Sequence, residues 1–310
     1  MLKVSFICTV FNEENTLLKL LDSLLLQTKV PDETIIVDGD SKDKTFDLLK
    51  QASTSKIYKK LNIRFFKIKG NRSIGRNLAI QNAKYPIIVC SDAGCILDKN
   101  WCSKITSPFE EEKIDVVAGY YRGKTDSLFQ KAQLPYVFVM ENKLNSKTFL
   151  PSSRSMAFTK KIWHKIGGFP KEFSHNEDYV FANRLKKSGA KITFVKEAIV
   201  YWLPKSNLKE LYIMFYRFAR GDIEASLIRP KVILIFLRYL MILTLLIIFI
   251  YTKSLFIGFC LLLLIILYIL WSIQKNYQYI LNPLAFYLLP LFQVTSDVAV
   301  ISGSLRGLFK

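Results

Sequence analysis

Two neighbouring apolar runs in the last third of the chain restrict its fold more than any other feature of the sequence. They cover residues 232–251 and 254–273, with only Thr252 and Lys253 between them. A helix of about 20 apolar residues can cross a bilayer, and buried helices of soluble proteins seldom run this long. Arg238 interrupts the first run within two turns of its start, where a long side chain can reach the interface. The sequence therefore predicts two transmembrane helices.

A third segment, residues 284–305, is also apolar but is diluted by other residue types. Its polar residues and prolines, counting one just before it, are Pro283, Pro290, Gln293, Thr295, Ser296 and Asp297. Dilution of this kind weakens the hydropathy signal of a membrane span. Three placements stay open for this segment: it spans the membrane, it re-enters, or it lies at the membrane surface.

The flanks of the apolar runs predict which side of the membrane the remaining chain occupies. The first eight residues are too short an apolar run for a signal peptide, and acids follow them. Basic residues, which favour the cytoplasmic side, cluster before the first run and at its start. They are Lys205, Lys209, Arg217, Arg220, Arg229, Lys231 and Arg238. We therefore expect a multi-pass protein of the cell membrane, with a cytoplasmic domain at residues 1–222 and a membrane region at residues 223–310.

The net charge and the cysteines exclude two classes of function. The formal charge of +19 is explained by the membrane, because basic juxtamembrane residues attract anionic lipid by about 1 kcal/mol each. No segment interleaves basic and aromatic residues as RNA-binding sheets do, so nucleic acid is not an expected partner. The five cysteines match neither a zinc site nor a disulfide framework and are expected to be reduced, mostly buried thiols.

Residues 4–90 alternate between strand and helix patterns. Strands are predicted at residues 4–10, 34–37, 63–67 and 86–90, and helices at 12–27, 41–51 and 73–83. This alternation predicts an α/β fold, a doubly wound and mainly parallel sheet with helices on both faces. Ligands of such sheets bind at the carboxyl ends of the strands, where Thr9, Asp38 and Asp92 are expected to meet.

The pattern changes after Asp115, in what is expected to be the second half of the same domain. Strands are predicted at residues 116–121 and 191–195, with turns at 151–154 and 167–170. A helix is predicted at residues 178–188, and Gly189 is its expected C-cap.

Acids follow two of the predicted strands. Asp92 stands in the tight Ser91–Gly94 segment, and one such carboxylate suits Mg²⁺, which completes its shell with phosphate oxygens and water. That chemistry implies a substrate that carries a diphosphate. Asp38 can accept hydrogen bonds from a nucleobase or a ribose. The alternative role for an acid here is a helix cap, which we assign to Ser41 or Asp40 instead.

Asp178, at the start of a predicted helix, is the best candidate for a general base, since an attacking hydroxyl must lose its proton. The alternative is that it only complements the helix dipole. His175 is a second candidate for the base.

Several arginines are placed to meet phosphate groups. Arg72 and Arg76 flank Gly75 at a predicted helix start near the strand ends. Arg217 and Arg220 lie one helical turn apart, and they either clamp a leaving diphosphate or belong to the basic stripe that faces the membrane.

Taken in order and spacing, these segments resemble family 2 inverting glycosyltransferases of the GT-A fold, the nucleotide-diphospho-sugar transferase fold, over residues 3–222. The matching motifs are Thr9-Val10-Phe11-Asn12-Glu13-Glu14, Val37-Asp38-Gly39-Asp40-Ser41-Lys42-Asp43-Lys44-Thr45, Gly75-Arg76-Asn77-Leu78-Ala79, Ser91-Asp92-Ala93-Gly94, Gly167-Gly168-Phe169 and Glu177-Asp178.

The resemblance implies a role for each candidate residue. Asp178 would be the catalytic base of an in-line, inverting attack, and Asp92 would bind a divalent cation, Mn²⁺ or Mg²⁺, and the diphosphate. The residues expected to bind the nucleotide sugar are Thr9, Phe11, Glu13, Asp38, Asp40, Arg76 and Asp92. Those expected to border the acceptor or the diphosphate are Arg154, Glu177, Arg217 and Arg220.

The segments at residues 151–158 and 217–222 are most similar to membrane-associated transferases that extend lipid-linked exopolysaccharide units, such as succinoglycan-type glucosyltransferases. The Gln-x-x-Arg-Trp motif of processive synthases is absent, and Tyr216-Arg217-Phe218-Ala219-Arg220 stands in its place. The resemblance therefore implies transfer of one sugar from a nucleotide diphosphate to a lipid-linked saccharide.

The chain also departs from the family pattern at two of its acids. It has Asp38-Gly39-Asp40-Ser41 where Asp-Asp-Gly-Ser is common, so which carboxylate contacts the base stays open. It has Asp92-Ala93-Gly94 where the family has Asp-x-Asp, which leaves one carboxylate fewer for a metal. Two alternatives to the implied function stay open, namely sugar transfer to a polyprenyl phosphate and a non-catalytic nucleotide-binding membrane scaffold.

Overall fold

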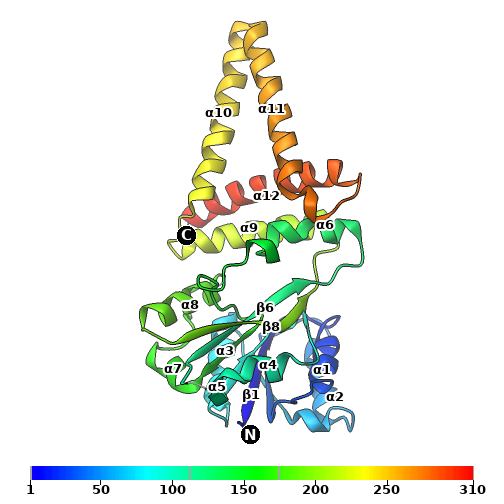
Figure 1. Ribbon diagram of the computed structural model, residues 1–310, viewed down its shortest axis with the longest axis vertical. Coiled ribbons are helices and arrows are strands. Elements are labelled where there is room, and N and C mark those ends of the chain that lie inside the picture. The colour runs from blue at the N-terminus through cyan, green and yellow to red at the C-terminus, as the bar shows by residue number, and fades with distance from the viewer. Residues whose placement is uncertain (1, 112, 174, 310) are drawn as a thin grey trace. The chain divides into compact units, whose positions relative to one another are not determined.

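The computed structural model describes residues 2–111, 113–173 and 175–309. The chain forms two compact units (Figure 1). Unit 1 contains the chain up to Lys124 together with Glu141–Leu203, and unit 2 contains Thr125–Met140 together with the chain from Pro204 onwards. A short segment from the middle of the chain thus belongs to the unit that holds the apolar helices. The domain boundary at residue 222, which rests on composition, stays a prediction.

Unit 1 is built on an eight-stranded sheet with the order β3-β2-β1-β4-β7-β6-β8-β5. Its first four strands are parallel, as the alternation of strands and helices predicted. They are β1 (Val4–Val10), β2 (Glu33–Asp38), β3 (Ile63–Lys67) and β4 (Ile87–Cys90). The carboxyl ends of β1 and β2 therefore lie side by side, and Thr9 pairs with Val37 and Val10 with Asp38.

The other half of the sheet is mixed rather than parallel. Strand β7 runs antiparallel to both β4 and β6, β8 is parallel to β6, and β5 is antiparallel to β8. These strands are β5 (Cys95–Leu97), β6 (Val116–Gly123), β7 (Met156–Thr159) and β8 (Ile192–Trp202). The expectation of a mainly parallel sheet thus holds for the first half only, because β7 leaves a tight turn at residues 152–155 and runs back along β4.

Helices cover both faces of the sheet. Successive side chains of a strand point to opposite faces, so neighbouring residues of β1 show which helix lies on each face. On β1, Ile7 packs in a core with Ile80 of α3, whereas the neighbouring Phe6 packs edge-on against Trp101 of α4, with ring centroids 6.1 Å apart. The helices of unit 1 are α1 (Leu17–Leu25), α2 (Thr45–Thr54), α3 (Arg72–Asn82), α4 (Trp101–Thr106), α5 (Pro108–Glu111), α7 (Lys160–Lys165) and α8 (Glu177–Lys187), with short 3₁₀ turns at Lys59–Leu61 and Glu141–Lys143.

Two helices begin later than their sequence patterns predicted. Helix α1 begins at Leu17 rather than at residue 12, and α2 begins at Thr45 rather than at residue 41. In both cases the polar residues before the helix are used in contacts between the two loops. The C-cap of α8 is Ser188 rather than Gly189, and Gly189 follows it with a positive φ of 73°, the left-handed position that glycine favours after a helix.

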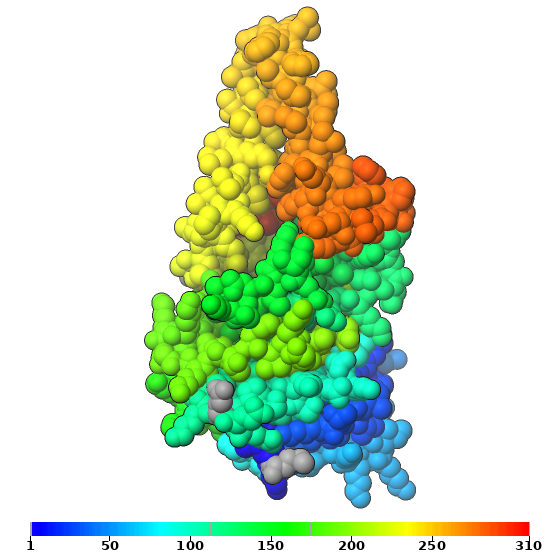
Figure 2. All heavy atoms as spheres, viewed as in Figure 1, coloured from blue at the N-terminus to red at the C-terminus, as the bar shows by residue number. Residues whose placement is uncertain are grey.

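Unit 2 consists of helices. They are α6 (Leu128–Val137), α9 (Leu208–Glu224), α10 (Pro230–Thr252), α11 (Leu255–Asn276) and α12 (Ala285–Leu308), with a 3₁₀ turn at Tyr277–Tyr279. Three of them are long and apolar enough to cross a membrane, with mean hydropathies of 2.8 for α10, 2.8 for the α11 segment and 1.4 for α12. In Figure 2 the side chains of α10 and α11 project beyond the rest of unit 2. The two predicted transmembrane segments therefore form a helical hairpin.

Gly119 provides a test of the packing in unit 1. A Cβ at this position would collide with the hydroxyl of Ser155 and would lie 2.7 Å from the carbonyl oxygen of Ala198. The Ser155 hydroxyl cannot move away freely, because it accepts a hydrogen bond from Trp101 Nε1 at 2.8 Å. We expect Gly119→Ala to lower the free energy of unfolding by about 1–3 kcal/mol.

Urea unfolding of the detergent-solubilised protein, followed by tryptophan fluorescence, measures this loss. The matched control is Gly94→Ala, because a Cβ at Gly94 would meet no atom within 4 Å. Its effect on unfolding should stay within about 0.5 kcal/mol. Equal midpoints for both variants would show that the contact at Gly119 is not tight.

Candidate active site

Helix α3 is held tightly against the sheet by Gly75. A Cβ here would lie 2.7 Å from Cγ2 of Thr9 on β1, so only glycine permits this approach. Two residues further on, Asn77 fixes the predicted glycine turn. Its Nδ2 donates to the carbonyl of Phe169 at 2.8 Å, and its Oδ1 accepts from the N–H of Phe169 at 2.9 Å and from Trp163 Nε1 at 3.0 Å. The Gly75-Arg76-Asn77 motif thus connects α3 to the sheet and to the glycine turn.

Arg76, between these two residues, is the centre of the site. Its side chain is 2% exposed. Nη1 donates to Oε1 of Glu177 at 2.6 Å, and Nη2 donates to Oδ1 of Asp92 at 3.0 Å and to Oγ of Ser153 at 2.9 Å. One guanidinium therefore joins α3, the loop after β4, the turn before β7 and the start of α8. A fork of fixed donors suits such bridging between carboxylates.

A turn of serines positions the two acids that the sequence singled out. Ser152 Oγ donates to Oδ2 of Asp178 at 2.8 Å, and Ser153 Oγ donates to Oδ1 of Asp92 at 3.1 Å. The turn is itself held by Ser91 Oγ, which donates to the carbonyl of Arg154 at 2.8 Å. The sequence predicted a turn here but not the roles of Ser152 and Ser153. Two consecutive hydroxyls in a turn were the only signal.

Arg154 lies among aromatic rings. Its guanidinium carbon is 5.3 Å from the ring centroid of Tyr121 and 5.7 Å from that of Trp202. Burial opposes the charge of Arg154, but Tyr121 and the carboxylates of Asp92 and Asp178 outweigh it and raise the pKa of Arg154 above its usual value. Arg154 therefore provides a fixed positive charge that acts on both acids. Tyr121 and Trp202 were not among the predicted site residues.

Their surroundings move the pKa values of the two acids in opposite directions. Burial and the neighbouring carboxylate of Glu177 raise the pKa of Asp178 above its ordinary value. Burial would also raise the pKa of Asp92, but Arg76, helped by Arg72 and Arg154, lowers it overall. A pair of acids separated in this way suits an ionised ligand and a proton acceptor.

The segments at residues 9–14 and 38–45 interlock at the ends of β1 and β2. The N–H of Asn12 donates to Ser41 Oγ at 2.9 Å, and the N–H of Glu13 donates to Thr45 Oγ1 at 2.7 Å. In return, Asn12 Oδ1 accepts from the N–H of Lys42 at 2.8 Å. The predicted nucleotide-binding residues of both motifs thus lie in the ends of β1 and β2 or in the two loops, which are hydrogen-bonded to each other.

Asp38 and Asp40 play different parts in these loops. Asp38 is fully buried, and it accepts hydrogen bonds from the N–H groups of Asp40 and Ser41 and from the Ser41 hydroxyl. Asp40 adopts a positive φ of 72° and forms ion pairs with Lys42 at 2.6 Å and Lys67 at 3.2 Å. The helix cap assigned to Ser41 or Asp40 is wrong, because α2 follows Lys44 and has no side-chain cap.

The remaining predicted residues lie in three places. Thr9 is the last residue but one of β1, and Phe11 projects from the following loop with 57% of its surface exposed. Arg217 and Arg220 belong to α9 of unit 2, where Arg220 pairs with Glu224 at 2.7 Å. Their part in the site stays a prediction.

Asp92 is the residue that fits a divalent cation. Within the described ranges, no group of three or more His, Cys, Asp or Glu residues could hold a metal by itself. However, Asp92 is 36% exposed and uses only Oδ1 in its hydrogen bonds to described residues. Its Oδ2 can therefore ligate Mn²⁺ or Mg²⁺, which would take its other ligands from phosphate and water.

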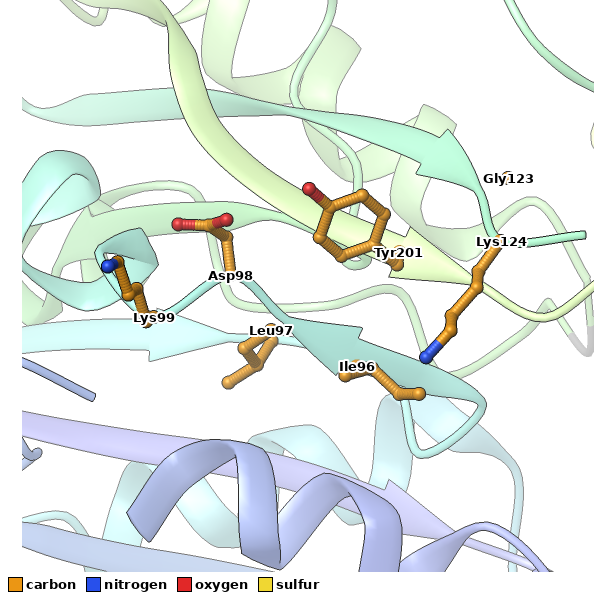
Figure 3. Close-up of a pocket in the computed structure, with 7 residues that line it drawn as sticks. All are labelled: Ile96, Leu97, Asp98, Lys99, Gly123, Lys124 and Tyr201. Carbon is orange, nitrogen blue, oxygen red and sulfur yellow. The ribbon is translucent and has the colours of Figure 1, made fainter. Parts of the chain in front are cut away.

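A separate cavity of about 530 Å³ lies beside β5 (Figure 3). Its lining residues are Ile96, Leu97, Asp98, Lys99, Gly123, Lys124 and Tyr201. Tyr201 pairs with Ile96, and the next residue, Trp202, pairs with Cys95. Since neighbouring side chains of a strand face opposite sides, Tyr201 and Ile96 lie on the face away from Trp202 and Arg154. The cavity is therefore distinct from the acid site.

An acid after β4, an interlocked loop pair after β1 and β2, and a mixed second half of the sheet are together the features of the GT-A fold. The sequence comparison is more specific. The glycosyl transferase family 2 domain matches residues 5–167, more than half of the 310 residues, and the glycosyl transferase family group 2 domain matches residues 88–296. The chain belongs to glycosyl transferase family 2 and is a glycosyltransferase, as its motifs implied.

Two characterised relatives are similar over most of the chain. The O-antigen chain rhamnosyltransferase RfbN of Salmonella typhimurium is 26% identical over 215 residues, which cover 64% of this chain and 66% of RfbN. The succinoglycan biosynthesis protein ExoA of Rhizobium meliloti is 22% identical over 197 residues, which cover 60% of this chain and 58% of ExoA. The matched regions thus span less than two thirds of either relative.

Solved structures support the fold. The mannosyltransferase PcManGT from Pyrobaculum calidifontis, in complex with GDP-Man and Mn²⁺, has a TM-score of 0.66 at 16% identity and covers 99% of this chain and 87% of its own. Residues 1–349 of TarS from S. aureus, in complex with UDP-GlcNAc, have a TM-score of 0.51 at 19% identity and cover 98% of this chain and 92% of their own.

The structure predicts that Arg76 stabilises unit 1. Arg76→Met would leave the buried carboxylate of Glu177 without its cation, and breaking a buried pair from one side costs about 3–5 kcal/mol. Arg76→Lys keeps the charge but cannot bridge the same acceptors, so its loss should be smaller. Urea unfolding of the solubilised protein measures both values.

The control for this prediction is Arg72→Met, the same change at an exposed position in the first turn of α3. Its effect on unfolding should stay within about 0.5 kcal/mol. If Arg72→Met and Arg76→Met destabilise the protein equally, the central role of Arg76 is wrong.

Proposed function

We propose that this protein moves a single sugar from a nucleotide diphosphate to a lipid-linked saccharide in the assembly of a surface polysaccharide, with inversion at the anomeric carbon. The arrangement of Asp92, Glu177 and Asp178 around Arg76 and the serine turn carries this proposal. The relatives point to the same class of pathway, since one is named for O-antigen chains and the other for succinoglycan biosynthesis.

The donor would bind at the carboxyl ends of β1, β2 and β4. The exposed ring of Phe11 offers a stacking surface for a base, and the loops that contain Glu13, Asp38 and Asp40 surround the nucleoside. A cation held by Asp92 would neutralise charge that develops on the leaving diphosphate. PcManGT, a protein of the same fold, is in complex with GDP-Man and Mn²⁺, which supports a nucleotide sugar and a divalent cation as the ligands.

Asp178 would act on the acceptor. Its raised pKa, caused by burial and by Glu177, increases its ability to take the proton from an attacking hydroxyl. Ser152 and the N–H of Tyr179 hold its two oxygens at 2.8 Å each, so the carboxylate is oriented before the acceptor arrives. Attack from the side opposite the diphosphate inverts the anomeric carbon. Arg154, on its aromatic support, lies where an acceptor phosphate or saccharide would meet a fixed cation.

The membrane helices suit an acceptor that is anchored in lipid. We place unit 1 in the cytoplasm, where nucleotide sugars are made, because the basic residues flank α10 on its N-terminal side. The exposed apolar helices α10 and α11 would then hold the enzyme at the surface where its acceptor lies. The soluble donor and the lipid-linked acceptor would then meet at the membrane surface.

The donor is identified by the release of nucleoside diphosphate from a panel of UDP-, GDP- and dTDP-sugars. Detergent-solubilised wild type and Asp178→Asn are compared with Mn²⁺, with Mg²⁺ and with EDTA. We expect one donor to be turned over, at least a hundredfold more slowly in Asp178→Asn, because general base catalysis contributes about 10²–10⁴-fold. EDTA should abolish turnover if Asp92 works through a cation.

The acceptor is tested with a lipid extract, a purified lipid-linked saccharide and a polyprenyl phosphate. Stimulation by the saccharide alone supports the proposal, whereas stimulation by the bare phosphate favours the alternative of transfer to polyprenyl phosphate. No turnover of any donor with any acceptor would favour the non-catalytic scaffold.

The contact between Ser152 and Asp178 predicts a change in the pH profile. Because the Ser152 hydroxyl stabilises the ionised form, Ser152→Ala should raise the pKa of Asp178. A base must be ionised to act, so the acidic limb of the kcat/KM profile should move to higher pH, by about 0.5–1 unit for a hydrogen bond of ordinary strength. Ser152→Thr retains a hydroxyl and should move the limb less. A limb that moves to lower pH would contradict the assigned roles.

A further inference from the structure

We propose that α9 and α12 form an interfacial platform, that α12 does not cross the bilayer, and that the α10–α11 hairpin is the membrane-spanning part of residues 204–309. The partner of the platform is the bilayer surface on the side of unit 1. The inference does not depend on the sugar or the acceptor of the proposed function.

The first observation is the direction of α12 within unit 2. Figure 1 shows α12 and α9 side by side, across the base of the hairpin that α10 and α11 form. A helix alongside the hairpin would share the hydrocarbon layer with it, whereas a helix across the base lies near its entry point. Consistent with this, one third of the most apolar window of α12 is buried in the protein, compared with none for α10.

The second observation is that α12 is bound closely to α9, a helix that cannot enter hydrocarbon. A Cβ at Gly303 would collide with the carbonyl of Tyr216, and a Cβ at Gly307 would lie 2.8 Å from Cβ of Ile223 and 3.0 Å from the carbonyl of Arg220. Small residues spaced by four positions permit such close packing of helices.

The last two turns of α9 are strongly charged. They contain Arg217, Arg220, Asp222 and Glu224, of which Arg220 pairs with Glu224 and Asp222 pairs with Arg229 just before α10. A charged side chain at the centre of the bilayer costs about 2.5–3.5 kcal/mol on the insertion scale. If α12 crossed the membrane, it would either draw these charges into the hydrocarbon or lose its contact with α9. A position at the interface keeps the contact and leaves the charges near the headgroups.

The third observation concerns the other end of α12, which is held by α6, a helix that carries Gln130, Lys131 and Gln133. Phe292 packs edge-on against Phe129 of α6, with ring centroids 4.8 Å apart, and the hydroxyl of Tyr136 donates to the carbonyl of Leu289 at 2.9 Å. Helix α6 is itself tied to the chain before α9, because Gln133 Nε2 donates to the carbonyl of Lys205 at 2.7 Å. Both ends of α12 are therefore attached to helices that carry charged side chains, Lys131 on α6 and the acids and arginines of α9.

A buried polar cluster fixes the level at which α12 meets the hairpin. Asp297 of α12 forms an ion pair with Arg238 of α10 and accepts a hydrogen bond from Tyr268 of α11 at 2.6 Å. Arg238 lies eight residues after the start of α10, and Tyr268 lies eight residues before the end of α11. At 1.5 Å per residue, both are about 12 Å from the base of the hairpin, within reach of a helix that lies there.

The face of α12 away from α9 suits the lipid side of an interface. Its exposed apolar side chains include Tyr287, Val294, Val298 and Leu305. Their spacings of seven, four and seven residues place them on one stripe of the helix. The glycines that pack on α9 lie on the opposite stripe. One apolar stripe and one stripe bound to a charged helix are the features of a helix that lies in the interface.

The test is the labelling of single cysteines from outside intact cells with a membrane-impermeant maleimide. Cys260→Ser is the background, because the other four cysteines are buried in unit 1. Lys253→Cys marks the loop between α10 and α11, and Leu308→Cys marks the end of α12. We expect Lys253→Cys to be labelled in intact cells and Leu308→Cys to be labelled only after permeabilisation.

Either of two results would overturn the proposal. Labelling of Leu308→Cys in intact cells would mean that α12 crosses the membrane, and protection of Lys253→Cys until permeabilisation would mean that the hairpin does not. Fusions of a cytoplasmic fluorescent reporter after residue 309 and of alkaline phosphatase at residue 253 give a second measurement of the same two positions. The expected result is activity of both reporters.

A separate pair of variants tests the contact between α9 and α12. Gly303→Leu should separate the two helices and lower the thermal stability of the solubilised protein, whereas Val298→Leu on the exposed stripe adds bulk to the same helix without such a contact. Equal thermal stabilities for the two variants would contradict the platform.

Discussion

The rest of unit 1 depends on the hydrogen bonds and ion pairs that the buried guanidinium of Arg76 forms. A buried cation is tolerated only where carboxylates and hydroxyls satisfy its donors, and here Glu177, Asp92 and Ser153 do so. These partners come from α8, from the loop after β4 and from the turn before β7, so one charge fixes the distance between elements that approach the sheet from different parts of the chain. Gly75 and Asn77 complete this constraint, because the glycine allows α3 to lie against β1 and the amide holds the Gly167–Phe169 turn.

The charge of Arg76 also affects the pKa values of Asp92 and Asp178, which are shifted in opposite directions. Asp92 shares a hydrogen bond with Arg76, and its pKa is lowered, whereas Asp178 lies beside Glu177, whose carboxylate helps burial to raise its pKa. Glu177 therefore has two effects, since it neutralises Arg76 and at the same time makes its neighbour more basic. This division of roles explains why two acids stand side by side at Glu177 and Asp178. Glu177 satisfies the structural cation, and Asp178, the next residue in the chain, is the one that we propose accepts a proton.

The sequence predicted the parts of the fold that local patterns encode and missed those that depend on distant contacts. The parallel strands β1 to β4 follow from alternating apolar runs. Asp92 and Asp178 were singled out as candidates because one follows a strand and the other lies in the first turn of a helix. The antiparallel path of β7 was not predicted, because strand order in the second half depends on long-range pairing. Ser153 lies 77 residues from Arg76 and 61 from Asp92, so no local period reveals their contact. The late starts of α1 and α2 have the same cause, since Asn12 and Ser41 are used to join two loops rather than to begin helices.

Composition alone could not place α12, for a physical reason that concerns its two faces. A hydropathy average mixes the stripes that pack on α9 and on the hairpin with a stripe that is exposed. Gln293 and Asp297, which lower the average, are buried against the hairpin. Gln293 and Asp297 bond to each other at 2.9 Å, and Asp297 also binds Arg238 and Tyr268. These groups are satisfied within unit 2, so the energetic penalty that polar residues carry in a lone helix does not apply to them. Whether such a helix spans or lies flat is then decided by the charges of the helix to which it is attached, and α9 supplies them.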